Sequence, residues 1–209
     1  DPSLRARIVN EMRLTVEGGL GPQVMVISRF EQRPDWEGKN LAEVAGVLKL
    51  TPTEAAIELV LLGDPSMVVH SMSPPDVERF MTQPYTSTSS DGENPVFGVG
   101  QPHPRSYGSF PHKLREYVLE KKVLSMQAAI RAATSLPAEV LGLKDRGALT
   151  QGNFADIVVF DPATIRDKAT FSDPHQYSEG IAYLLVNGVL TVDHDQYTGA
   201  RAGRVGLRK

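Results

Sequence analysis

The chain has 209 residues, of which 41% are hydrophobic and 22% charged, and its formal net charge is −3. This balance is typical of a soluble globular protein with room for one large domain, or for one and a half small ones. The charge gives no sign of nucleic-acid binding, because basic residues gather only near the end, at Arg201, Arg204, Arg208 and Lys209. The absence of cysteine excludes disulfides and Cys-ligated metal within the chain.

No apolar run approaches the ~20 residues of a membrane-spanning helix, and the N-terminus lacks the apolar stretch of a signal peptide. The sequence therefore predicts a cytoplasmic protein that binds neither a membrane nor nucleic acid. It begins at Asp1 without an initiator methionine, so we expect that the chain starts in the middle of a longer protein.

The first 90 residues alternate between helical and strand patterns. Apolar residues at helical spacing predict helices over 3–17 and 41–50, and capping signatures at Thr51 and Ser73 open two more. Short β-type runs predict strands over 24–27, 67–70 and 85–90. Because strands that alternate with helices usually lie parallel, this half predicts an α/β fold with a parallel sheet.

The segment from Asp91 to His112 is rich in proline and histidine. An acid at the end of a strand, followed by glycine, points out of the sheet, where barrel and open α/β enzymes hold their catalytic groups. No periodicity indicates a helix or strand here, so we expect an ordered loop that contains Arg105. The alternative is a surface turn at Asp91-Gly92 with Arg105 as a solvated charge.

The rest of the chain changes character near residue 145. Helical patterns cover 113–120, 125–134 and 136–142. Afterwards come strand patterns over 157–160, 181–186 and 189–192, the last two joined by the two-residue hairpin turn Asn187-Gly188. We therefore predict one domain over 1–145 and a small antiparallel β-domain over 146–209.

The stretch from Leu124 to Pro162 resembles the C-terminal signature of the amidohydrolase superfamily, which consists of metal-dependent hydrolases built on a (β/α)8 barrel. It reads LSMQAAIRAATSLPAEVLGLKDRGALTQGNFADIVVFDP. The resemblance tightens to the N-acyl-D-amino-acid deacylases, or D-aminoacylases. It does so through Ser90-Asp91-Gly92, His103-Pro104-Arg105, Tyr107-Gly108 and the tail motif Thr198-Gly199-Ala200-Arg201.

This resemblance implies a fold and an activity. Residues 1–145 would be the C-terminal part of the barrel, and residues 146–209 a segment of a small β-sandwich or β-barrel domain. The implied reaction is zinc-dependent hydrolysis of the amide bond of an N-acyl-D-amino acid. Asp91 matches the family's general base and is a possible metal contact. Arg105 matches the partner of the substrate carboxylate, and Tyr107 is a lesser substrate-binding candidate.

The family's zinc ligands, a His-x-His pair, a Cys and two further histidines, do not occur in this sequence. His70 is the one histidine considered as a ligand, although a packing role is favoured, and His103 between two prolines is expected to shape the loop. The resemblance thus implies that Zn²⁺ is held by a missing N-terminal portion, the expected partner of this chain. Alone, the chain should be inactive and stable only with that portion or as a rearranged oligomer.

Two alternatives remain open from the sequence. One is another amidase of the same superfamily, similar to dihydropyrimidinase or dihydroorotase. The other is a non-catalytic subunit that assembles beside a separate metal-binding chain.

Overall fold

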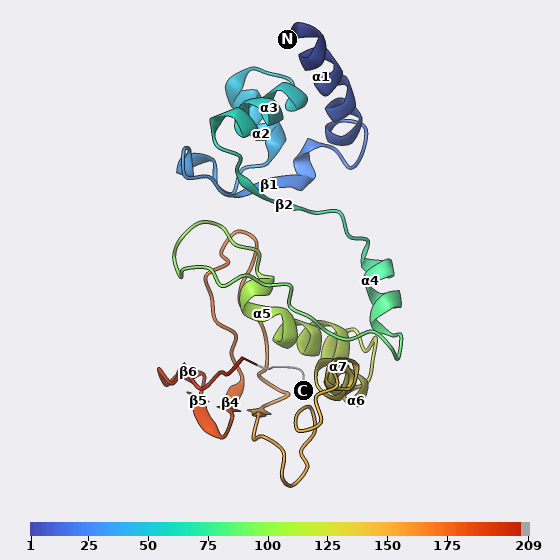
Figure 1. Cartoon of the computed structure of the whole chain (residues 1–209), viewed down its shortest axis with the longest axis vertical. Helices are drawn as coiled ribbons and strands as arrows, with labels where there is room; N and C mark the ends of the chain where they lie inside the picture. Colours follow the sequence, from blue (N-terminus) through green and yellow to red (C-terminus); the bar gives the residue numbers. More distant parts are fainter. Residues whose placement is uncertain (206–209) are drawn as a thin grey trace. The chain divides into compact units, whose positions relative to one another are not determined.

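The computed structural model describes residues 1–205, and Figure 1 shows the order of the elements along the chain. The last four residues, with Arg208 and Lys209 and the end of the predicted domain 146–209, lie outside the described residues. The chain forms two compact units. The first holds residues 1–72, 93–103 and 170–175, and the second holds residues 73–92, 104–169 and those from 176 onward.

The helices of the first unit begin at the signals that the sequence carries. Thr51 and Glu54 form the predicted capping box, in which the Glu54 carboxylate accepts the Thr51 backbone N–H at 3.0 Å. The predicted helices over 3–17 and 41–50 are confirmed. The helical elements are α1 (Pro2–Val16), α2 (Leu41–Leu48), α3 (Pro52–Leu62) and the two 3₁₀ turns η1 (Pro22–Val24) and η2 (Pro34–Trp36).

The two strands of this unit lie antiparallel, so the predicted parallel sheet is wrong. β1 (Met25–Arg29) pairs with β2 (Ser66–Val69), and Ile27 lies opposite Met67. The cause is the connection from β1 to β2, because it consists of two helices, α2 and α3, that pack together as a helical hairpin. Two helices reverse the chain once more than a single crossover helix does, so the second strand returns in the opposite direction.

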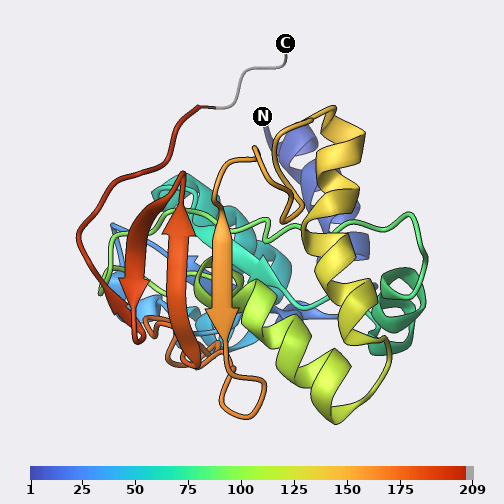
Figure 2. The same cartoon turned by 90° about the horizontal axis from the view of Figure 1, so that it is seen from below.

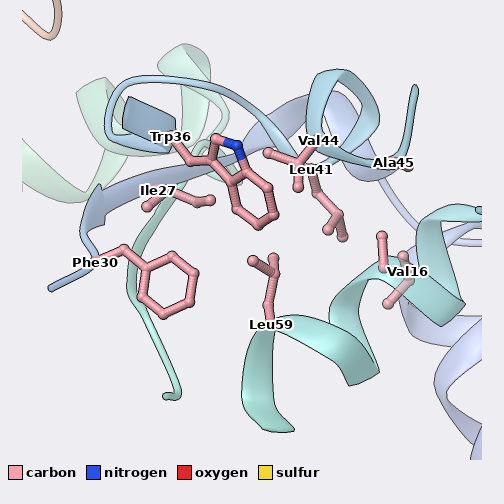
Figure 3. Close-up of a cluster of buried hydrophobic side chains, with 9 residues drawn as sticks. Val16, Ile27, Phe30, Trp36, Leu41, Val44, Ala45 and Leu59 are labelled. Carbon is pink, nitrogen blue, oxygen red and sulfur yellow. The ribbon is translucent and has the colours of Figure 1, made fainter. Parts of the chain in front are cut away.

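The core of the first unit gathers around the only tryptophan (Figure 3). Trp36 and Phe30 lie with their ring centroids 6.2 Å apart, and Leu59 reaches them from α3. Each fully buried large apolar side chain stabilises the fold by about 1.5–3 kcal/mol. The cluster comprises Val16, Ile27, Phe30, Trp36, Leu41, Val44, Ala45, Ala55 and Leu59.

The second unit holds a run of helices and a sheet. Its helices confirm those predicted from Ser73 onward, over 113–120, over 125–134 and over 136–142. They are α4 (Pro74–Met81), α5 (Arg105–His112), the π-helical η3 (Lys113–Glu120), α6 (Met126–Ala133) and α7 (Ser135–Leu141).

Two expectations for this unit are wrong. The segment 85–90 belongs to no strand, because within residues 1–205 nothing pairs with it along a ladder, and Thr88 N–H instead donates to the Ala132 carbonyl at 2.8 Å. The expected loop over 91–112 contains helix α5. Pro111 obscures that helix in the sequence, since proline lacks the N–H that would bond to the carbonyl four residues earlier.

The sheet of the second unit is an antiparallel meander (Figure 2, orange to red). The predicted strands and hairpin are confirmed, with φ of 51° at Asn187 and 81° at Gly188 as a two-residue turn of this type needs. A short fourth strand was not expected. The strands are β3 (Ile157–Phe160), β4 (Ile181–Val186), β5 (Val189–Asp193) and β6 (Gln196–Tyr197).

Within residues 1–205 the chain therefore has an α/β fold with two antiparallel sheets, and the predicted barrel portion stays a prediction. The predicted boundary between 1–145 and 146–209 stays a prediction. Helices with the length and hydropathy needed to cross a membrane do not occur within residues 1–205.

We expect Leu59→Ala to lower the free energy of unfolding of the first unit by about 2–5 kcal/mol, because it leaves a cavity beside Trp36. Leu61→Ala is the matched control, since Leu61 on the same helix is 68% exposed and its loss should cost less than about 0.5 kcal/mol. Urea unfolding followed by the fluorescence of the single tryptophan measures both. Equal losses for the two variants would contradict the assigned core.

Candidate functional site

Asp91 and Arg105, the two charged residues singled out in the sequence, form an ion pair. Arg105 Nη2 lies 2.9 Å from Asp91 Oδ2, and both residues belong to the second unit. The side chains are accessible, with 82% of Asp91 and 41% of Arg105 exposed. An exposed pair of this kind contributes about 0–1 kcal/mol to stability. Its geometry is thus of more interest than its energy, because it brings an acid and a cation together at the surface.

The backbone around Asp91 is built as a tight turn. Asp91 has a φ of 47°, in the left-handed region that aspartate tolerates better than most residues. The hydroxyls of Ser89 and Ser90 accept the N–H groups of Asp91 and Gly92 at 3.4 Å and 3.3 Å. These local bonds turn the chain at Asp91.

Gly92 brings this turn close to the start of α5. A Cβ on Gly92 would lie 2.9 Å from Ser106 Cα and 3.1 Å from the Arg105 carbonyl oxygen. Both are backbone atoms, which cannot move aside as the end of a flexible side chain can. The absence of a side chain at residue 92 is therefore what lets Asp91 lie beside Arg105.

The helix that carries Arg105 is also fixed on another side. His112 Nδ1 lies 3.0 Å from Asp167 Oδ2, and Gly108, one turn earlier, passes so close to Asp167 that a Cβ would lie 2.5 Å from that residue's own Cβ. The Ser178 hydroxyl donates to the Tyr107 carbonyl at 3.1 Å. That carbonyl is the acceptor that Pro111 cannot use, so this bond replaces the one the helix lacks.

Tyr107 lies on the same helix and packs edge-on against Tyr177, with ring centroids 5.7 Å apart. Burial, and next the charge of Tyr177, raise the pKa of Tyr107 above its ordinary value of 10.0. The phenol therefore stays protonated near neutral pH and can donate a hydrogen bond. Tyr107 lines an apolar groove of about 1540 Å³ in the second unit, whereas neither Asp91 nor Arg105 lines it.

Sequence reasoning missed Lys113, at the junction of α5 and η3. Its side chain is buried, and Nζ donates a hydrogen bond of 2.7 Å to Thr88 Oγ1. Burial lowers the pKa of Lys113 below its ordinary value of 10.5. The signal was the four-residue spacing of Arg105, Ser109 and Lys113, which has meaning only once α5 is recognised as a helix.

The histidines do not assemble a metal site. His70 and His103 each pack edge-on against Phe171 in the first unit, and His175 Nε2 lies 3.1 Å from the Gly100 carbonyl oxygen. Within residues 1–205, no three His, Cys, Asp or Glu side chains gather closely enough to bind a metal ion. The described residues therefore do not fit a complete zinc site.

The model of the Amidohydrolase family matches residues 50–192. The chain belongs to the amidohydrolase family. The resemblance predicted from the sequence is thus confirmed at the level of the family.

Its relatives include deacylases of N-acyl-D-amino acids. The chain is 38% identical over 172 residues to the N-acyl-D-aspartate deacylase of Alcaligenes xylosoxydans xylosoxydans, covering 82% of this chain and 33% of that protein. It is 37% identical over 180 residues to the D-aminoacylase of the same organism, with 86% and 36% covered. The amidohydrolase chain thus spans about a third of the length of these curated relatives.

A solved structure is similar over nearly the whole chain. It is that of the N-acyl-D-glutamate deacylase from Bordetella bronchiseptica, complexed with zinc and a phosphonate inhibitor that mimics the tetrahedral intermediate of the reaction. The TM-score is 0.80 at 32% identity, and the match covers 97% of this chain and 40% of that one. That relative holds zinc, as the cofactor prediction expects of the family.

We expect Gly92→Ala to lower the free energy of unfolding by about 1–3 kcal/mol, because the added methyl group meets backbone atoms at the start of α5. Gly203→Ala is the control, since a Cβ at Gly203 meets no atom within 4 Å. Equilibrium unfolding followed by circular dichroism compares the two. A neutral Gly92→Ala would show that the turn at Asp91 is not pressed against α5.

Proposed function

We propose that this chain is part of an enzyme that hydrolyses the amide bond of N-acyl-D-amino acids, giving a carboxylate and a D-amino acid. Asp91 is the general base, and Arg105 binds the α-carboxylate of the substrate. The observation that supports this assignment most directly is the 2.9 Å approach of Arg105 Nη2 to Asp91 Oδ2. The names of the relatives supply the class of substrate.

The chemistry of the substrate explains why the two groups should be neighbours. In an N-acyl amino acid, the α-carboxylate and the amide nitrogen are attached to the same carbon atom. A cation that binds the carboxylate must therefore lie close to the group that serves the amide. The guanidinium of Arg105 offers a planar fork that suits two parallel hydrogen bonds to a carboxylate.

The proton transfers follow from the same arrangement. A water oxygen attacks the carbonyl carbon of the amide while the Asp91 carboxylate takes a proton from that water. The C–N bond then breaks, and the protonated Asp91 returns the proton to the departing amine nitrogen. The exposure of the Asp91 carboxylate leaves room for both the water and the substrate. Tyr107 keeps a lesser role, as a protonated phenol that packs against Tyr177.

In this proposal the zinc ligands of the family lie outside the described residues. Zinc would activate a water and polarise a carbonyl when bound, but the described residues offer no group of ligands for it. We assign the ligands to a preceding portion of a longer protein, since the chain spans only about a third of its curated relatives. That portion is the proposed partner of this chain, and the cytoplasm remains the proposed location.

We expect Arg105→Met to lower kcat/KM for N-acyl-D-amino acids at least 100-fold in the full-length protein, meaning this chain expressed with its upstream sequence. The loss of a charge-assisted pair to the substrate carboxylate causes the effect. Arg79→Met, at an exposed arginine of the same unit, is the control. Unchanged hydrolysis in Arg105→Met, or hydrolysis of cyclic amides in place of N-acyl-D-amino acids, would favour a dihydropyrimidinase- or dihydroorotase-like enzyme instead.

We also expect residues 1–209 alone to bind no zinc and to hydrolyse no N-acyl-D-amino acid, whereas the full-length protein does both. Intact mass, metal analysis and activity of the two preparations test this. A well-behaved, zinc-binding and active monomer of residues 1–209 would contradict the proposal. A full-length protein that binds no metal and is inactive would favour the non-catalytic subunit.

A further inference from the structure

Helix α5 presents one side chain per turn to the segment that carries Asp91. Arg105, Ser109 and Lys113 are spaced four residues apart, so they share one face of the helix, which continues without a break into η3. Their partners follow in the reverse order along that segment, as Asp91, Ser90 and Thr88. The helix and the segment are therefore joined by three contacts in a fixed register.

The middle contact is the weakest of the three. The Ser109 hydroxyl lies 2.9 Å from the Arg105 carbonyl oxygen and 3.4 Å from the Ser90 carbonyl oxygen. A hydroxyl has a single proton to donate, so the shorter bond within the helix takes it. The register of the segment consequently depends on its two ends, at Asp91 and at Thr88.

The contact at Thr88 differs from the ion pair because it is less exposed. Lys113 is 7% exposed, and its 2.7 Å bond to the half-buried Thr88 hydroxyl is partly buried. Thr88 is also bound to α6, through the 2.8 Å bond from its N–H to the Ala132 carbonyl. Thr88 is thus a fixed point, and only Ser89 and Ser90 separate it from Asp91.

A lysine is a costly way to fill this position. Removing an ammonium group from water disfavours its charged form, and burial accordingly lowers the pKa of Lys113. An apolar side chain of similar length would fill the same space without that cost. An apolar side chain could not donate to the Thr88 hydroxyl, however, so what the lysine adds at this position is its bond to the segment.

We propose that Lys113 is a positioning residue, whose hydrogen bond to Thr88 sets the register of residues 88–91 on α5 and so places the Asp91 carboxylate beside Arg105. This inference rests on the proposed function, in which Asp91 is the base. Lys113 acts through Thr88 and does not touch the reacting atoms. A general base displaced by about 1 Å can lose on the order of 100-fold in rate.

The test compares Lys113→Met, Thr88→Val and the double variant in the full-length protein, with Lys144→Met as a control at an exposed lysine of the same unit. We expect kcat to fall about 10–100-fold in each of the first two, with KM within about twofold, because Arg105 stays on α5. The double variant should be no slower than Lys113→Met, since both changes remove the same bond.

Two further readouts separate positioning from stability. The melting temperature of Lys113→Met should be unchanged or higher, because a buried charge is removed. Amide hydrogen exchange over residues 89–92 should become about tenfold faster in Lys113→Met and stay unchanged in Lys144→Met. A lower melting temperature with normal kcat and normal exchange would overturn the inference, as would additive effects of the two substitutions.

Failure of the proposed function gives a different result. An Asp91→Asn protein that keeps its activity, or a wild-type protein that does not hydrolyse N-acyl-D-amino acids, would remove the assignment of Asp91. The exchange measurement still decides the positioning role in that case, because it reports the segment directly. Faster exchange over residues 89–92 supports the role of Lys113, and unchanged exchange rejects it.

Discussion

The close approach of residues 88–92 to helix α5 is the constraint on which the candidate site depends. Gly92 permits it, since any side chain there would meet the backbone of Ser106. At the other end of the segment, Lys113 joins it to the helix through the hydrogen bond to Thr88. The segment between them makes no ladder with a strand within residues 1–205, so its position is set by these contacts with helices rather than by a sheet. These contacts therefore set the position of the Asp91 carboxylate.

The helix itself is held by the β-rich part of the second unit. Asp167 lies against Gly108 and contacts His112 one turn later. The Ser178 hydroxyl donates to the Tyr107 carbonyl, which Pro111 cannot reach with a hydrogen bond because proline has no backbone N–H. A helix with an internal proline is thereby stabilised where local propensity alone would not stabilise it. The C-terminal part of the chain, through Asp167 and Ser178, thus fixes the orientation of the helix that carries Arg105.

The accuracy of the sequence predictions follows the range of the interactions involved. The capping box at Thr51 and the hairpin at Asn187 depend on neighbouring residues, and the sequence predicts both. The direction of β2 depends on how two helices pack between the strands, and α5 depends on partners at Asp167 and Ser178. No local pattern contains that information. The sequence singled out Asp91 and Arg105 but not Lys113, whose meaning depends on a helix that the pattern does not show.

The weakness of the Asp91–Arg105 pair is consistent with the proposed function. Because both side chains are accessible, breaking their contact costs about 0–1 kcal/mol, so a substrate carboxylate can replace Asp91 on the guanidinium at little expense. The exchange frees the Asp91 carboxylate for water while keeping it next to the bound substrate. A deeply buried pair would be harder to open, because each charge would be left without a partner in a medium of low dielectric. In this arrangement the buried charge is Lys113, which would hold the segment in place, and the exposed charges are those that would meet the substrate.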